Sequence, residues 1–144
     1  MAIPKILGDP RYEAYRMELN KRTGERSTFI SNTLQEIPEL TFNPTYGAFY
    51  NTIVFKEGTL THQQTLPIKN ERVKSLVEKW VEGVSLDFRF VYYLLGATGI
   101  CVVPISSFCS DLRGFRITLL EENEQLLKQT FTTLRDSIRT YLDS

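Results

Sequence analysis

One arginine lies in the middle of an otherwise apolar stretch near the end of the sequence. The stretch reads Phe-Arg-Ile-Thr-Leu-Leu from Phe115. Side chains alternate along a strand, so one face would carry Phe115, Ile117 and Leu119, and Arg116 would lie on the other. A planar guanidinium can bind a carboxylate through two parallel hydrogen bonds and keeps its charge. The residues alone leave two interpretations open: a ligand-binding cation or, more commonly, a solvent-facing strand residue.

Two cysteines and one histidine are the other candidates for chemistry. Cys101 lies in the run Ile100–Val103, which reads as a buried strand ended by Pro104, so we expect a buried thiol. Cys109 follows in a polar loop and could be exposed. His62 has no second His or Cys near it in sequence, so no metal site is predicted. No catalytic constellation and no glycine-rich phosphate loop is recognisable, and two cysteines do not predict a disulfide framework.

Acidic and basic residues balance, with 17 of each. A chain without net charge has no field that would attract nucleic acid or an acidic membrane surface. No apolar run approaches the roughly 20 residues of a membrane span. The first ten residues lack the basic start and apolar core of a secretion signal. We therefore expect a cytoplasmic protein with neither nucleic acid nor membrane as a partner.

The elements that must position these residues begin with a helical stretch. Asp9 is a plausible N-cap with Pro10 at the first helical position. At Gly24 either one long helix continues or two helices meet, and Pro38 closes the stretch after about Ile37. Two strands should follow, at Leu40–Phe42 and Ala48–Phe55.

Helical periodicity returns in the second half of the chain. Asn70 caps an amphipathic helix in which Trp80 reads as a core anchor. A second helix starts at Ser85 or Asp87 and stops at Gly99. Its inward residues should be Phe88, Val91, Leu94 and Leu95. A terminal helix over 121–142 repeats apolar residues every three or four positions, at Leu127, Phe131, Leu134, Ile138 and Tyr141.

The predicted order is helix, two strands, two helices, two strands, helix. Helices segregated from a small, mostly antiparallel sheet make an α+β two-layer domain. The 144 residues, 42% of them hydrophobic, are enough for one domain with its own core. We therefore expect a single domain over residues 1–144.

Three motifs in order resemble a known family. They are Asn43-Pro44-x-x-Gly47-Ala48-Phe49-Tyr50, then Thr98–Pro104 followed by Ser106-x-Phe108, and finally Gly114–Leu120. Together they resemble the C-terminal part of pyridoxal-phosphate-dependent aminotransferases of classes I and II, nearest to the alanine aminotransferase group. The likeness runs from roughly Arg26 to Leu142. Ile105 departs from the family, which usually has glycine after the proline.

The resemblance implies a small domain that closes over the active site. It implies that Arg116 binds the α-carboxylate of the amino acid, with Ser106, Phe108, Gly47 and Tyr50 as possible lining residues. The domain would belong to a longer enzyme, with residues 1–24 as a helical lead-in that links it to an absent large domain. The expected partners are an amino acid or 2-oxo acid, that large domain, and a second copy of the full-length enzyme in a homodimer.

The resemblance also implies that pyridoxal phosphate is bound by the absent large domain. None of the seven lysines here lies in the family's cofactor-lysine motif. We therefore expect no cofactor-binding, catalytic or metal-ligating residue in this chain, which alone should not catalyse. Two alternatives remain. One is a non-catalytic amino-acid binding domain that uses the same arginine. The other is an interaction module, with Arg116 solvated and the Trp80 or Tyr50 surface meeting a protein partner.

Overall fold

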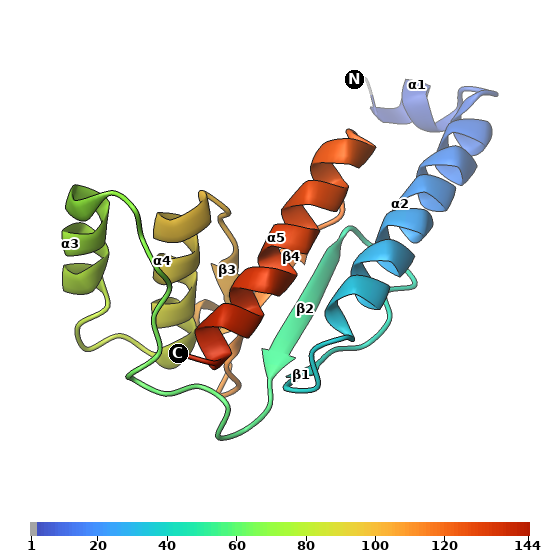
Figure 1. Ribbon diagram of the computed structural model, residues 1–144. Helices are drawn as coiled ribbons and strands as arrows, with labels where there is room; N and C mark the ends of the chain where they lie inside the picture. The colour runs from blue at the N-terminus through green and yellow to red at the C-terminus, as the bar shows by residue number, and fades with distance from the viewer. Residues whose placement is uncertain (1–2) are drawn as a thin grey trace.

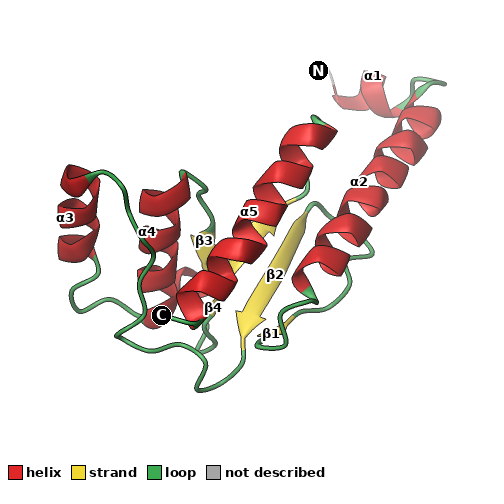
Figure 2. Cartoon of the chain, viewed as in Figure 1, coloured by secondary structure: helices red, strands yellow, loops and turns green. Residues whose placement is uncertain are grey.

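Residues 3–144 are described by the computed structural model, in which helices cover one face of a four-stranded sheet (Figures 1 and 2). The elements in chain order are α1 (Ile3–Leu7), α2 (Tyr12–Leu34), β1 (Leu40–Thr41), β2 (Tyr50–Phe55), α3 (Glu71–Trp80), α4 (Leu86–Thr98), β3 (Val103–Pro104), the 3₁₀ helix η1 (Ile105–Phe108), β4 (Gly114–Thr118) and α5 (Glu124–Leu142). Apart from α1 and η1, this is the predicted order. The predicted α+β two-layer class is confirmed.

The sheet is antiparallel throughout, in the order β1-β2-β4-β3. Arg116 of β4 is paired with Thr52 of β2 on one side and with Val103 of β3 on the other. The face that carries Ile53 and Phe115 is buried under the helices, whereas the face that carries Thr52 is exposed. The predicted alternation along β4 is therefore confirmed, and Arg116 lies on the face opposite the one that the α-helices of residues 3–144 bury.

The core lies between the sheet and the long C-terminal helix. The five apolar residues predicted to face inward from α5 are all buried: Leu127, Phe131, Leu134, Ile138 and Tyr141. Aromatic rings join the layers at the centre, where Phe90 of α4 lies 5.1 Å from Phe55, 5.5 Å from Phe115 and 5.2 Å from Tyr141, measured between ring centroids. Edge and tilted contacts of this kind stabilise the core beyond what the buried area of each ring contributes.

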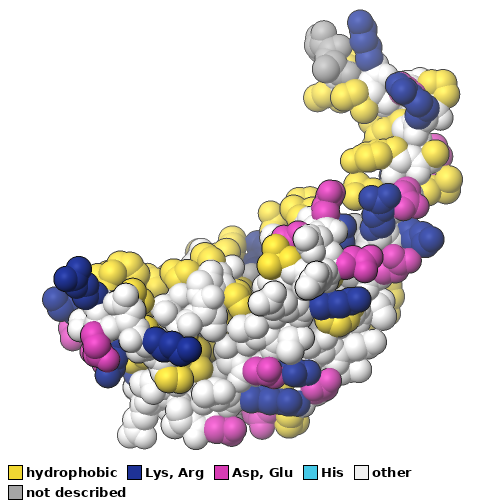
Figure 3. All heavy atoms as spheres, turned by 45° about the horizontal axis from the view of Figure 1, so that its top comes forward, with side chains coloured by type: hydrophobic (Ala, Val, Ile, Leu, Met, Phe, Trp, Pro, Cys, Tyr) yellow, Lys and Arg dark blue, Asp and Glu magenta, His cyan; other side chains and the backbone are white. Residues whose placement is uncertain are grey.

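The N-terminal helix differs from the prediction at both ends. α2 is one continuous helix through Gly24, which resolves the alternative left open by the sequence. It begins at Tyr12 rather than Pro10, and Asp9 accepts a hydrogen bond from the Arg11 backbone N–H at 2.9 Å. Its first buried residue is Ser27, so the half before it makes few contacts and projects from the domain with α1 (Figure 3). The predicted lead-in over 1–24 falls in this part, with residues 1 and 2 outside the described residues.

Three expectations about the second half of the chain are wrong. Trp80 is 46% exposed and lies against Tyr92 rather than in the core, because α3 packs on α4 mainly through Val77. Cys101 is exposed, since the strand starts only at Val103. The strand predicted over Ile100–Val103 is shorter, since β3 is only Val103–Pro104; it does end at Pro104, whose missing N–H is tolerated at the sheet edge.

Other predicted details are confirmed or refined. Asn70 caps α3 by accepting hydrogen bonds from two backbone N–H groups, and Gly99 ends α4 with a left-handed φ of 78°. Cys109 is exposed. In α4, Val91 and Leu94 are buried as expected, while Phe88 and Leu95 are only half-buried. The fully buried positions that the periodicity missed are Asp87 and Phe90.

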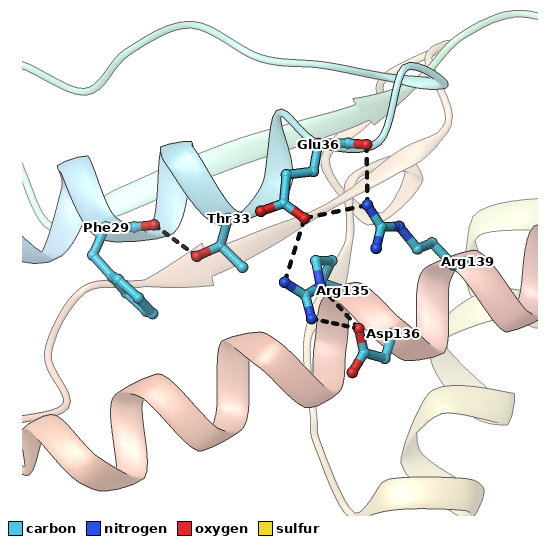
Figure 4. A network of polar contacts seen from close by, with 6 residues as sticks. All are labelled: Phe29, Thr33, Glu36, Arg135, Asp136 and Arg139. Atoms are coloured by element: carbon cyan, nitrogen blue, oxygen red, sulfur yellow. Dashed lines mark hydrogen bonds and ion pairs between the residues drawn. The ribbon is translucent and has the colours of Figure 1, made fainter.

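An ion-pair network ties the segment after α2 to α5 (Figure 4). A carboxylate oxygen of Glu36, Oε2, lies 3.3 Å from Arg135 Nη1 and 3.2 Å from Arg139 Nη2. Arg135 also pairs with Asp136. Because these groups are partly solvated, the network should contribute little to stability.

Candidate functional site

Arg116 is held against two aromatic rings on the open face of the sheet. Its central guanidinium carbon, Cζ, lies 4.4 Å from the centroid of the Tyr50 ring and 4.6 Å from that of Phe108. Tyr50 comes from β2 and Phe108 from η1, which follows β3, so the rings approach from the elements on opposite sides of β4. Cation–π contacts of this kind orient the guanidinium plane.

The guanidinium of Arg116 makes no hydrogen bond and no ion pair with any residue in 3–144. Arg26, Arg89 and Arg139, by contrast, each donate to a backbone carbonyl. Aromatic rings over a guanidinium use its π face and leave the in-plane N–H donors available. A half-buried, oriented cation with free donors is suited to bind a planar anion such as a carboxylate.

A buried carboxylate fixes the turn that presents Phe108. Asp87, at the first turn of α4, is 0% exposed. Its Oδ2 accepts a hydrogen bond from the Ser106 backbone N–H at 3.0 Å, and its Oδ1 accepts one from the Ser106 hydroxyl at 2.9 Å. Ser85 Oγ donates to the same Oδ1 at 2.6 Å. Burial by itself would raise the pKa of Asp87, but these donors and the Phe88 N–H together lower that pKa below its usual value.

The sequence-predicted lining residues fall into two groups. Tyr50 and Phe108 are brought to Arg116. The Ser106 hydroxyl is engaged by Asp87, and Gly47 lines a hollow of about 820 Å³ between α2 and the loop before β2. Arg116 is not among the residues that line this hollow.

Two features of the site were missed by the sequence reasoning. Asp87 was noted only as a helix start, because its partners include Ser106, 19 positions away in the chain. Ala48, just before β2, has a φ of 60°, a left-handed conformation that is uncommon for alanine. Apart from the adjacent Gly47, no local pattern predicts this conformation.

The residues of this chain do not fit pyridoxal phosphate by themselves. All seven lysine side chains are exposed: Lys5, Lys21, Lys56, Lys69, Lys74, Lys79 and Lys128. Lys21 and Lys128 line a hollow of about 510 Å³, but its four cations are matched by four glutamates, which leaves no net positive charge for a phosphate. An imine-forming lysine works in an enclosed, desolvated site, which none of these exposed lysines provides.

Within the described part of the chain, no three His, Cys, Asp or Glu side chains gather as metal ligands. His62 is exposed. Over the same residues, no helix combines the length and the apolar character needed to cross a membrane.

Comparison with known proteins relates this domain to aminotransferases, although no family model matches. The chain is 41% identical over 142 residues to an uncharacterized aminotransferase of Methanocaldococcus jannaschii, covering 99% of this chain and 33% of that protein. It is 27% identical over 145 residues to alanine aminotransferase 2 of Xenopus laevis, covering 97% of the chain and 24% of the relative. It is 30% identical over 120 residues to alanine aminotransferase 1 of Bos taurus, covering 81% of the chain and 21% of the relative.

The chain is thus an α+β domain with a sequence related to aminotransferases over nearly its whole length. It spans about a third or less of the relatives that it matches. Both findings are consistent with the C-terminal small domain of an aminotransferase.

Proposed function

We propose that this chain is the substrate-binding small domain of a pyridoxal-phosphate-dependent amino-acid aminotransferase, and that Arg116 binds the α-carboxylate of the substrate. The observation that supports this most directly is the guanidinium itself, which is half-buried, oriented by two rings, and without a hydrogen bond or ion pair to residues 3–144. The aminotransferase names of the relatives supply the class of substrate.

The physical role of Arg116 in this proposal is positioning. A bidentate guanidinium–carboxylate pair fixes both the distance and the plane of the bound acid. Holding a substrate amine at one place relative to a reactive group lowers the entropic part of the barrier. Because Arg116 is on a paired strand, its position is more precisely fixed than it would be on a loop.

The remaining parts of the reaction belong to polypeptide outside this chain. In the proposal, a large domain carries pyridoxal phosphate, which supplies the amino-transfer chemistry, and the small domain closes over the bound amino acid or 2-oxo acid. The full-length enzyme would be a cytoplasmic homodimer. The sheet face opposite the α-helices, with Arg116 at its centre, is the surface that would turn toward the large domain.

Kinetics of the complete enzyme with Arg116→Lys test the proposal. A hydrogen bond to a charged group contributes about 1.5–3 kcal/mol, so loss of the bidentate fork should lower kcat/KM for amino acids by about 10- to 100-fold. The control variant is Arg113→Lys, which changes a half-buried arginine three residues away that touches neither ring. An amine substrate without a carboxylate serves as the second control. Equal kinetics for Arg116→Lys and Arg113→Lys would remove Arg116 from substrate binding.

A non-catalytic amino-acid binding domain makes a different prediction. Such a domain would bind L-alanine or pyruvate tightly as the 144-residue chain alone. The sheet face around Arg116 offers only one charged group to a ligand, so we expect the isolated chain to bind these acids no tighter than millimolar. Calorimetric titration of the isolated chain separates the two functions.

A further inference from the structure

Asp87 is a buried carboxylate that has no positively charged partner. Its oxygens accept hydrogen bonds from the Ser85 hydroxyl, the Phe88 N–H, and both the N–H and the hydroxyl of Ser106. No ion pair to Asp87 is present in residues 3–144. Two of its four donors are therefore local to the start of α4, while the other two come from one residue 19 positions away.

The two bonds to Ser106 couple α4 to the turn after β3. A carboxylate taken out of water is strongly destabilising unless hydrogen bonds replace its hydration. If Ser106 moved, Asp87 would lose half of its donors while staying buried. The helix start therefore holds Ser106 in one place, and Ile105 beside it is buried as well, at 4% exposure.

Phe108 depends on that turn for its position. It is the last residue of η1, two residues after Ser106, and its side chain is 52% exposed. Cys109 ends the turn with a left-handed φ of 57°. Because the core does not hold the Phe108 ring, the ring lies 4.6 Å from Arg116 only as long as the first half of η1 stays where Asp87 fixes it.

We infer that Asp87 is a positioning residue for Arg116: by holding Ser106 it fixes η1, so that the Phe108 ring stacks on the guanidinium. The chain of contacts runs from α4 to η1 to β4 and joins the buried side of the sheet to its open face. The benefit of this link for carboxylate binding rests on the proposed function. The link itself does not, because every contact in it lies within the described residues.

The side-chain Nε–Hε resonance of Arg116 in the ¹⁵N-labelled 144-residue chain tests the link without any ligand. An aromatic ring 4.6 Å away shifts this proton through its ring current. The resonance is identified by its loss in Arg116→Lys, and Phe108→Leu gives the full change expected when the ring is absent. In Asp87→Asn one of the two acceptor oxygens becomes an NH₂ group, which cannot accept from the donors on its side. We expect this variant to move the resonance at least half as far as Phe108→Leu does.

Gln64→Met is the matched control. Gln64 is buried and polar like Asp87, and its side chain bonds Thr61, Thr59 and Leu142, none of which is in η1. It should lower stability and leave the Arg116 resonance in place. A folded Asp87→Asn chain with an unmoved resonance overturns the inference. If Asp87→Asn does not fold, Ser106→Ala decides: a shift toward the Phe108→Leu position supports the link, and no shift overturns it.

The same variants separate this inference from the proposed function. In the complete enzyme, Ser106→Ala should raise KM for amino acids and leave an amine without a carboxylate unaffected. If the Arg116 resonance moves in Asp87→Asn or Ser106→Ala but the kinetics of Arg116→Lys match those of the unchanged enzyme, the positioning link is supported and the carboxylate-binding role of Arg116 is contradicted. If Arg116→Lys impairs the enzyme but the Arg116 resonance does not move in Asp87→Asn or Ser106→Ala, Arg116 binds substrate without help from Asp87.

Discussion

Arg116 and Tyr50 meet diagonally across two strands. Arg116 is paired with Thr52, and Tyr50 is paired with Thr118, yet the guanidinium carbon lies 4.4 Å from the Tyr50 ring centroid. Diagonal neighbours on one face of an antiparallel pair are within reach of long and aromatic side chains. The cation therefore leans along the sheet toward Tyr50 instead of extending straight into solvent.

A double-mutant cycle should measure this contact. We expect Tyr50→Leu and Arg116→Met to couple by about 0.5–1 kcal/mol in the free energy of unfolding, the usual range for exposed cation–π pairs. Urea unfolding of the four chains gives the value. Tyr50→Leu combined with Arg113→Met is the control cycle and should show no coupling. A zero coupling with Arg116 as well would mean that the stacking does not exist in solution.

Gly114→Ala should strongly destabilise the domain. A Cβ at Gly114 would lie 2.1 Å from the carbonyl oxygen of Ile53 and 2.9 Å from the Val54 Cα, both in the backbone of the paired strand β2. Because backbone atoms cannot move aside without opening the β2–β4 pairing, we expect a loss of at least about 2 kcal/mol, well within the range for overpacking.

Gly24→Ala is the matched control for this substitution. A Cβ there meets nothing within 4 Å, and the residue lies inside α2. The change should stabilise the chain by about 0.5–1 kcal/mol, since alanine favours helix over glycine. Denaturant unfolding compares the two variants, and equal effects would contradict the close approach of β2 and β4.

Tyr141 should make stability fall in alkali. Burial raises the pKa of the Tyr141 phenol well above its ordinary value, and the nearby Arg89 guanidinium offsets this only in part. An acid whose pKa is higher in the folded state contributes its full stability below the unfolded pKa, about 10, and loses it as the pH rises further. The unfolding free energy should therefore decline above about pH 10.

Tyr141→Phe should flatten that decline. The hydroxyl has no well-formed hydrogen bond with any group in the described chain, so its removal should be neutral or slightly stabilising at pH 7. Tyr46→Phe is the control, because Tyr46 is 95% exposed and should leave the pH profile as it is. If the two variants show the same change in unfolding free energy between pH 7 and pH 11, a buried Tyr141 phenol is contradicted.

Glu36→Gln should weaken the contact between the end of α2 and α5 only slightly. Its ion pairs with Arg135 and Arg139 are partly solvated, so we expect a loss below about 1 kcal/mol that shrinks further in 1 M salt, where the Debye length is about 3 Å. Glu39→Gln, which removes a carboxylate without an ion pair in residues 3–144, is the control. A large, salt-independent loss would show that the network carries more of the stability than its exposure suggests.

Patterns within a few neighbouring residues were sufficient to predict parts of α3, α5 and β4. The apolar repeat of α5 identified all five of its main core residues, and Asn70 marked the start of α3. Alternation along β4 placed Arg116 on the face opposite Phe115. These predictions succeed because helix and strand periodicity, and a capping side chain, are fixed by residues within a few positions of one another.

Other features were decided only by contacts between distant segments. Trp80 and Cys101 were expected in the core, yet Trp80 is 46% exposed with only its contact to Tyr92 beside it, and Cys101 is exposed. Asp87 reads as a helix start and is buried because Ser106 supplies donors from 19 positions away.

The sequence by itself determined the α+β class, the order of elements and the side of the strand on which Arg116 lies. Tertiary structure alone decided that Tyr50 and Phe108, 58 positions apart in the chain, converge on that cation. The physical reason is that strand order and turn geometry depend on the whole core. Pairing β2 and β3 on either side of β4 brings the two rings together, and no local pattern records that pairing.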